Sequence, residues 1–249
     1  MLMSRLIPVL LIRDKGLIKT VKFKEDKYIG DPINAVKIFN EKKVDEIIIL
    51  DIDATTKSQK PDYKMIESIA SQCRSPLCYG GGIKSVGIAR KILSLGVEKV
   101  AISSQAIKDP SILKALVAGI GSQSVVLVLD IKKKLLGGLE IMISNGTEKT
   151  GYDPIVFLKT IRDIGVGEIV INSIDNDGMM NGYPFRLFDQ LKEHIDVPMT
   201  ILGGAGSEAD LKDAVARYGT VGAAAGSYFV YKGKYKAVLI DYPKNPRDI

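Results

Sequence analysis

Two glycine-rich stretches, Tyr79-Gly80-Gly81-Gly82 and Leu202-Gly203-Gly204-Ala205, decide the fold because the chain repeats itself from each of them onward. The segments that they open, residues 79–107 and 202–230, align without a gap at an offset of 123 residues. Self-similarity at a fixed offset marks a fold that is built from copies of one unit. The sequence therefore predicts a duplicated architecture.

The match continues upstream of the glycines. Residues 44–53 align with residues 166–175 at an offset of 122, which nearly equals the first offset. Chance similarity between glycine-rich turns is the alternative, and two matches at almost one offset argue against it. Each copy fills about half of the 249 residues, so we place half-units at about residues 1–120 and 121–240 of a single domain, 1–249.

Short apolar runs alternate with longer amphipathic runs along the chain. The runs expected to form buried parallel strands are residues 6–12, 46–52, 99–102, 125–130 and 168–172. Helix starts with a capping aspartate and a proline at the first helical position are expected at Asp31-Pro32, Asp109-Pro110 and Asp153-Pro154. Half a barrel cannot bury its open edges, so we predict an α/β fold, a single (β/α)8 TIM barrel of two similar half-barrels.

In such a barrel the loops after the strands form the active face, and both copies place small residues there. Bare glycine backbone lets a ligand approach closely, and serines that open a helix offer N–H groups to an anion. The repeat predicts two phosphate sites, related by two-fold symmetry, for a doubly phosphorylated small molecule. The residues concerned are Gly81, Gly82, Ser103 and Ser104 in the first copy and Gly203, Gly204, Gly226 and Ser227 in the second.

Composition argues against several classes of protein. The chain is 46% hydrophobic and 26% charged, which is ordinary for a globular protein. No apolar stretch reaches the roughly 20 residues that span a bilayer, and the start lacks the pattern of a signal peptide, so we expect no membrane partner. The two cysteines, Cys73 and Cys78, are too few for a disulfide framework, and we expect a cytoplasmic location.

The net charge of +6 does not by itself indicate nucleic acid binding. The lysines are scattered, tryptophan is absent and aromatic residues make up only 6% of the chain. Nucleic acid binding calls instead for a basic stripe interleaved with stacking aromatics, so we predict no nucleic acid partner. A mildly positive surface attracts a phosphorylated or acidic small molecule.

His194 is the only histidine, which restricts the chemistry. A Ser-His-Asp triad would have to use it, and the chain has no Gly-x-Ser-x-Gly elbow to partner it. A zinc site built on histidines is disfavoured for the same reason, and we expect no metal and no cofactor. Acid–base chemistry then rests on carboxylates, lysines or thiols.

Several motifs together resemble one family. They are Arg5-Leu6-Ile7-Pro8, Gly30-Asp31-Pro32, Leu50-Asp51-Ile52-Asp53-Ala54, Gly80-Gly81-Gly82-Ile83, Gly121-Ser122-Gln123-Ser124-Val125-Val126, Ser173-Ile174-Asp175-Asn176-Asp177-Gly178 and Gly203-Gly204-Ala205-Gly206. Over nearly its full length the chain resembles HisF, the cyclase subunit of imidazole glycerol phosphate synthase. The resemblance implies a lyase subunit of a glutamine amidotransferase complex. A HisH-like glutaminase on the N-terminal face of the barrel supplies ammonia, which passes through to a ligand at the C-terminal face.

The chemistry of that family needs two aspartates, at the ends of strands one and five. The resemblance gives Asp130 the second position and matches Lys19 to a loop lysine that reaches the substrate; a plain surface lysine is the alternative for Lys19. The first position carries Leu11, which cannot move a proton. Asp14 lies three residues further on, where a loop position makes it a poor substitute. The loss argues against imidazole ring formation.

A second resemblance is closer. Residues 5–11, 77–82 and 237–243 resemble the WbuZ-type HisF paralogues of surface-glycan clusters. Those proteins work with a glutaminase subunit and a separate sugar amidotransferase. This resemblance implies that ammonia is handled for sugar amidation in surface glycan biosynthesis.

Charged residues at the starts of strands one, two, four and six match the ammonia gate of the family. They are Arg5, Glu46, Lys99 and Glu168. Two charges of each sign form a self-neutralising ring, which is the tolerable way to bury charge. The ring could gate ammonia or merely plug the barrel floor, and both roles can hold at once.

Asp177 and Gly178 follow strand six, and the resemblance places Asp177 at the active face. Asp51 ends strand two. Helix capping or loop structure is the alternative for both aspartates.

Three functions remain open at this stage. The first is an ammonia-using synthase subunit for sugar amidation, partnered by a glutaminase. The second is an authentic imidazole glycerol phosphate synthase cyclase. The third is a non-catalytic ammonia conduit, with the chemistry on another subunit. Leu11 weighs against the second, whereas Asp130 favours retained chemistry.

Overall fold

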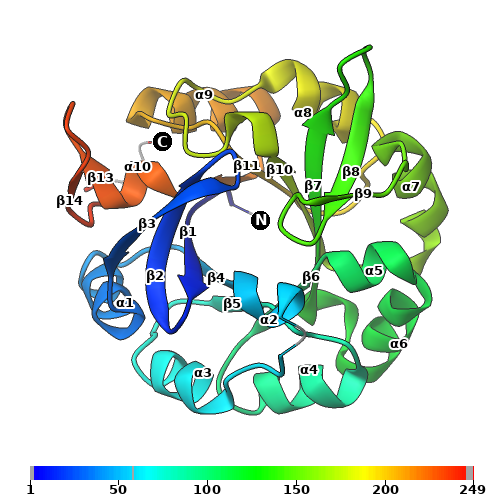
Figure 1. Ribbon diagram of the computed structural model, residues 1–249, viewed down its shortest axis with the longest axis horizontal. Helices are drawn as coiled ribbons and strands as arrows, with labels where there is room; N and C mark the ends of the chain where they lie inside the picture. The colour runs from blue at the N-terminus through cyan, green and yellow to red at the C-terminus, as the bar shows by residue number, and fades with distance from the viewer. Residues whose placement is uncertain (1–2, 58, 245–248) are drawn as a thin grey trace.

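A closed ring of eight parallel strands forms the centre of the computed structural model, which describes residues 3–57, 59–244 and 249 (Figure 1). Each strand pairs in parallel with the next, and the last pairs with the first. The strands are β1 (Arg5–Arg13), β4 (Ile47–Asp51), β5 (Leu77–Gly80), β6 (Lys99–Ile102), β7 (Val125–Lys133), β10 (Glu168–Ser173), β11 (Met199–Leu202) and β12 (Gly222–Ala225). The predicted (β/α)8 TIM barrel is confirmed.

Each half of the chain contributes four of these strands. Residues 1–120 supply β1, β4, β5 and β6, and residues 121–240 supply β7, β10, β11 and β12. The boundary falls at Gly121, which ends a helix with a φ of 85°. We propose that each half is one copy of the repeated unit.

Alternation of side chains along the strands separates two apolar layers. The outward-facing layer packs against the helices, which contribute the fully buried Phe39, Phe188 and Phe229. The inward-facing layer fills the barrel and consists of Ile7, Val9, Ile48, Cys78, Ala101, Val126, Val128, Val170, Leu202 and Ala224. Because both faces of the sheet are buried, the strands are recognisable in the sequence as continuous apolar runs.

Helices surround the barrel in the order of the chain (Figure 1). They are α1 (Pro32–Glu41), α2 (Ile52–Thr56), α3 (Tyr63–Ala70), α4 (Val86–Leu93), α5 (Ser104–Lys108), α6 (Ser111–Ile120), α7 (Pro154–Ile161), α8 (Phe185–Lys192), α9 (Glu208–Tyr218) and α10 (Ser227–Val230). Short 3-10 helices precede or follow strands, at η1 (Ser122–Ser124), η2 (Arg162–Ile164) and η3 (Ile174–Asn176).

Two of the three Asp-Pro helix starts occur as predicted. Asp31 caps α1 by accepting a hydrogen bond from the N–H of Asn34 at 2.8 Å, and Asp153 caps α7 in the same manner. At the third start the helix begins one residue late, at Ser111, so Pro110 precedes it. Asp109 still accepts the N–H of Ser111 at 3.0 Å, but the first turn has 3-10 hydrogen bonds, from Ile112 to Asp109 and from Leu113 to Pro110.

Two strands of the barrel continue beyond the C-terminal mouth as antiparallel extensions. After β1 the chain forms β2 (Gly16–Val21) and β3 (Lys24–Gly30), and after β7 it forms β8 (Leu139–Ile143) and β9 (Glu148–Lys149). Figure 1 shows these hairpins rising on opposite sides of the ring. They build walls around the end of the barrel where the strand loops meet.

The last strand is not followed by a long helix. The four-residue α10 leads into a small hairpin of β13 (Tyr231–Lys232) and β14 (Ala237–Val238), which projects from the side of the barrel (Figure 1). The chain then returns to the N-terminal strand, where the Tyr242 hydroxyl donates to the carbonyl of Leu6 at 3.1 Å. Among the described residues, no helix is long and apolar enough to cross a membrane.

Candidate functional site

A cavity of about 290 Å³ opens at the C-terminal ends of the barrel strands. Its walls come from β1, β4, β5, β6, β7 and β10, the β2–β3 hairpin and the loop after β8. Eight of the predicted site residues line it, namely Lys19, Gly81, Gly82, Ser103, Ser104, Asp130, Asp177 and Gly226. Four others lie outside the described lining, namely Gly178, Gly203, Gly204 and Ser227. The cavity therefore gathers most of the predicted site from distant parts of the sequence.

Asp177 fastens the β2–β3 hairpin over the mouth of this cavity. Its carboxylate accepts hydrogen bonds from the Thr20 hydroxyl at 2.8 Å and from the N–H of Phe23 at 3.4 Å. Its carbonyl accepts the N–H of Lys22 at 2.9 Å. The neighbouring Gly178 has a φ of 69°, and a β carbon there would collide with the carbonyl of Thr20. Asp177 thus holds a loop as well as lining the cavity.

Lys19 lies on the same hairpin and points inward. Its ammonium donates to the carbonyl of Val9 at 2.5 Å and lies against Gly226, at the start of α10. Burial lowers the pKa of Lys19 to about 8, although the charge of Asp177 opposes the shift. A plain surface lysine is excluded, because Lys19 is 5% exposed.

Asp130 lies on β7 and faces the cavity. Asn172 stands beside it on β10, where the strand register pairs the two residues, and its Nδ2 donates to Asp130 Oδ1 at 2.9 Å. Burial raises the pKa of Asp130 to about 7, against the hydrogen bond from Asn172, and the charge of Asp177 raises it further. A carboxyl that titrates near neutrality can both accept and return a proton.

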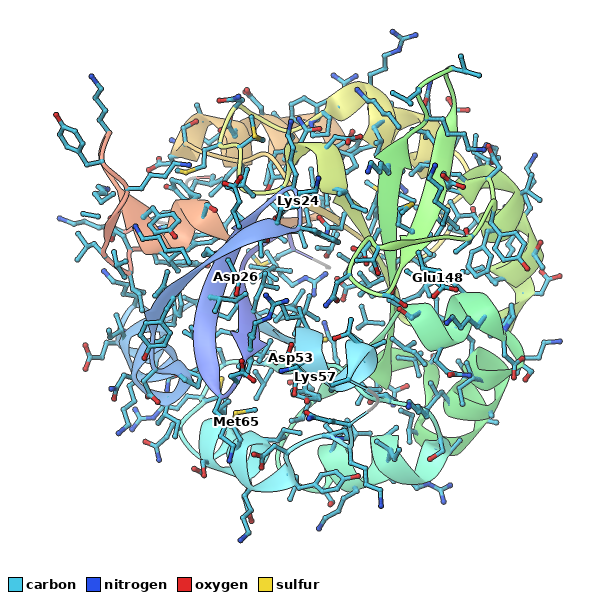
Figure 2. All side chains as sticks on the ribbon, in the orientation of Figure 1. Lys24, Asp26, Asp53, Lys57, Met65 and Glu148 are labelled. Atoms are coloured by element: carbon cyan, nitrogen blue, oxygen red, sulfur yellow. The ribbon has the colours of Figure 1, made fainter. Side chains whose placement is uncertain are left out.

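Leu11 lies on β1 and makes that wall of the cavity apolar. Its side chain packs against the inward-facing layer of the barrel beside Leu50. Asp14 does not replace it. The Asp14 side chain is 76% exposed and accepts from Lys57 at 2.9 Å, and Lys57 also pairs with Asp53 at 2.8 Å (Figure 2).

Asp51 combines a structural role with a place in the wall. Its Oδ1 caps α2 by accepting the N–H groups of Asp53 and Ala54 at 3.1 and 3.0 Å. Burial raises its pKa, against those hydrogen bonds. Gly81 packs directly on it with a φ of 128°, and a β carbon at Gly81 would lie 2.8 Å from that of Asp51. The helix-capping interpretation of Asp51 is thus realised, and Gly81 is required for close packing.

The serines at the end of β6 differ from one another. Ser104 Oγ accepts the N–H of Ser144 at 3.0 Å, so it ties the loop after β8 to the barrel. Ser103 Oγ is buried and has no hydrogen-bond partner among the described residues. Two lysines, Lys84 and Lys108, line the same side of the cavity. The ammonium of Lys108 is paired with Glu148 at 3.1 Å. The unsatisfied hydroxyl of Ser103 is suited to a polar or anionic group of a ligand.

Three of the four residues of the second predicted phosphate site do not line the cavity. Gly204 packs against the loop before α8, whose Gly182 donates its N–H to the Gly204 carbonyl at 3.0 Å. Ser227 is 6% exposed. Gly226 alone reaches the cavity, and the Lys19 ammonium rests on it. The symmetry of the repeat is therefore broken by a lysine that only the first half carries.

The opposite end of the barrel holds the four charged residues. Arg5 pairs with Glu46 and, at 2.9 Å, with Glu168, while Lys99 pairs with Glu46 at 2.9 Å and with Glu168 at 3.0 Å. The glutamate side chains are 2% and 5% exposed. Thr200 adds a hydrogen bond to Glu168 at 2.5 Å. Burial opposes ionisation of Glu168, but these partners outweigh it and lower its pKa.

Sequence reasoning did not single out Asn172, Thr20 or Phe23 as cavity residues. A signal for Asn172 exists, because an amide inside an apolar strand needs a partner. The partner follows only from the register between β7 and β10.

No group of three or more potential metal ligands occurs among the residues that the structure describes. Cys78 is buried inside the barrel, and burial raises its pKa well above the usual value.

Comparison with known proteins agrees with this geometry. The family model of the histidine biosynthesis proteins matches residues 5–236. A Vibrio vulnificus protein named "Putative imidazole glycerol phosphate synthase subunit hisF3" is 56% identical over 98% of this chain and 94% of its own length. The imidazole glycerol phosphate synthase subunit HisF of Oleidesulfovibrio alaskensis is 37% identical over 94% and 92%. The chain belongs to the HisF family.

A further relative is similar to this chain over nearly its whole length. A Leptospira interrogans protein named "Putative imidazole glycerol phosphate synthase subunit HisF" is 52% identical over 98% of this chain and 96% of its own length. The two relatives with "Putative" in their names are thus more similar in sequence to this chain than the Oleidesulfovibrio alaskensis HisF subunit, which is 37% identical. Because coverage is nearly complete in each case, the similarity extends over the barrel and both of its ends.

Proposed function

We propose that this HisF-family chain is an ammonia-using synthase subunit that receives ammonia from a glutaminase partner for the amidation of a sugar in surface glycan biosynthesis. The observation that carries the proposal is Leu11, which makes the β1 wall of the cavity apolar where the family reaction needs a second carboxylate. Asp130 and Lys19 remain in place at the same cavity. The site therefore supports simpler proton chemistry than imidazole ring closure.

The proposed reaction needs one proton acceptor. When ammonia attacks the activated carbonyl carbon of a sugar derivative, a C–N bond forms, the C–O bond to the activating phosphate breaks and phosphate leaves, and the new nitrogen gives up one surplus proton. Asp130 lines the cavity with a pKa of about 7 and can accept that proton. Lys19 stays cationic near neutral pH and can stabilise negative charge that develops on the oxygen of the reacting group.

The ammonia is proposed to come from a HisH-like glutaminase docked on the N-terminal face, with a separate sugar amidotransferase completing the assembly. Two features support a route through the barrel. The charged ring is self-neutralising, so a neutral molecule meets no net charge there. Above it the inward-facing residues Ile48, Val126 and Val170 are apolar, which favours NH₃ over ammonium.

We also propose a phosphorylated ligand, bound on the side of Gly82, Ser103 and Ser104. Lys84 lines the cavity on that side and supplies positive charge, Lys108 is already paired with Glu148 at 3.1 Å, and Ser103 Oγ supplies an unsatisfied hydroxyl. Inorganic phosphate in a calorimetric titration should bind the isolated chain, and Ser103→Ala together with Lys84→Ala should weaken that binding at least tenfold. Ser85→Ala is the matched control, since Ser85 caps α4 on the exposed surface. Equal affinity for phosphate in all variants would contradict the proposed phosphate site.

Authentic imidazole glycerol phosphate synthesis is the second candidate, and the names of the relatives favour it. Reconstitution distinguishes the two. The chain would be combined with a HisH-like glutaminase, and the products formed from glutamine would be followed by mass spectrometry. An amidated nucleotide sugar in the presence of the amidotransferase supports the proposal. Separate elution of the two proteins at micromolar concentration, with no transfer of glutamine nitrogen, would contradict it.

A further inference from the structure

The pair formed by Asp130 and Asn172 has an unusual hydrogen-bond balance. Both side chains line the cavity from neighbouring strands, and the amide nitrogen of Asn172 donates to the carboxylate at 2.9 Å. The amide oxygen has no partner. Among the described residues, only Asn172 Oδ1 and Ser103 Oγ are buried side-chain polar atoms left unsatisfied.

An unpaired buried acceptor is destabilising, so a residue kept only for structure is expected to satisfy it. Space exists beside this one. Asn172 is 4% exposed, and its Oδ1 borders Gly203, where a β carbon would lie 3.2 Å from the oxygen. Gly203 has a φ of 97° and keeps that space free of a side chain. The amide of Asn172 therefore has a hydrogen bond through its nitrogen to Asp130, while its oxygen has no partner.

An amide can serve a carboxyl group in both of its protonation states. A carboxylate only accepts hydrogen bonds, whereas a carboxylic acid donates one. A half turn of the amide about its last torsion angle exchanges the NH₂ group for the oxygen. For Asn172 this turn sacrifices no other hydrogen bond of Oδ1, because that atom has none.

We propose that Asn172 is a positioning residue that turns with the protonation of Asp130, donating to the carboxylate and accepting from the carboxylic acid. The inference rests on the proposed function, in which Asp130 is the strand-end carboxylate that moves protons. A site with two aspartates can divide the tasks of acid and base between them. Here Leu11 leaves Asp130 to take a proton and to give it back, and the turning amide keeps its geometry fixed throughout.

The electrostatic surroundings permit both states near neutral pH. Burial raises the pKa of Asp130 to about 7, and the charge of Asp177 on the loop after β10 adds to the shift. Lys19 on β2 faces Asp177, and Asp51 at the end of β4 lies across the cavity. Because burial also lowers the pKa of Lys19, to about 8, the transition is assigned to the pair by the carboxyl carbon of Asp130 itself.

Nuclear magnetic resonance of the full chain tests the turn without substrate or partner. Asparagine labelled with ¹⁵N and aspartate labelled with ¹³C would be followed from pH 5 to pH 9. The Asn172 amide protons are expected to shift with the same midpoint as the Asp130 carboxyl carbon. At low pH they should show a nuclear Overhauser contact to the α hydrogen of Gly203, which is lost at high pH as the amide oxygen returns to that side.

Two variants make the result decisive. Asn172→Leu assigns the resonances, and Asp130→Asn should abolish the transition of Asn172 near pH 7. A carboxyl that titrates while the contact to Gly203 never appears would show a static donor and overturn the inference. The same holds if Asp130 does not titrate between pH 5 and pH 9. A turning amide in a chain that forms no amidated sugar would instead refute only the proposed function.

Discussion

Formation of imidazole glycerol phosphate from ammonium chloride is expected to be about 10²–10⁴ times slower with this chain than with a HisF subunit that carries the strand-one aspartate. The reason is that Leu11 presents only carbon to the cavity, and Asp14 points to solvent with Lys57 as its partner. The measurement is the steady-state rate with the synthase substrate and saturating ammonium at pH 8. Proton transfer from one positioned group accounts for the whole expected deficit.

Substitution at the same position provides the control. Leu11→Asp should recover part of the rate, whereas Leu11→Asn, which has the same shape without an acidic proton, should not. Asp130→Asn should abolish any residual rate. Robust turnover by the unmodified chain would restore the authentic cyclase and refute the sugar amidation proposal.

Charge reversal at Lys99 is expected to damage both stability and ammonia transfer. Lys99→Glu leaves Arg5 facing three carboxylates at the barrel floor, and disrupting a buried ion pair costs about 3–5 kcal/mol of unfolding free energy. The measurement is urea unfolding of the isolated chain. In the reconstituted complex, the rate of product formation with glutamine as the nitrogen source should fall far more than the rate with ammonium salt.

Lys99→Met separates the two effects, because it removes the charge but leaves Arg5 to pair with Glu46 and Glu168. Its loss of stability should be smaller. If Lys99→Glu unfolds at the same urea concentration as the unmodified chain, the ring has no structural role. If it also leaves glutamine-dependent turnover intact, the ring is not part of the ammonia route.

The barrel could be predicted because its signals are local or repeated. Continuous apolar runs mark strands that are buried on both faces, and the offset of 123 residues makes the two halves visible. The β2–β3 hairpin gave no such signal. Its second strand, Lys24–Gly30, is mostly charged and exposed, and its position depends on Asp177, more than 150 residues away.

The candidate site was predictable only where chemistry and position coincide along the chain. Asp130, Lys19 and the serines after β6 stand at recognisable strand ends and loops. The contact of Asn172 with Asp130 depends on the register between β7 and β10, which cannot be predicted from the sequence. The repeat predicts equal anion sites in both halves, whereas the structure places the loop before α8 on Gly204 and the Lys19 ammonium against Gly226 in the second half. A repeated sequence motif therefore does not ensure that both copies line the cavity.

The return of the chain end to the first strand has a consequence for biosynthesis. The hydrogen bond from Tyr242 to Leu6 joins residues separated by 236 positions, and β12 closes the ring on β1. At about 5–20 residues per second, a ribosome would release β1 many seconds before its second neighbour exists. During that interval one side of β1 stays unpaired, and such a strand edge is prone to wrong pairing. Truncation just before β12 should therefore yield an aggregating chain instead of a weakened barrel.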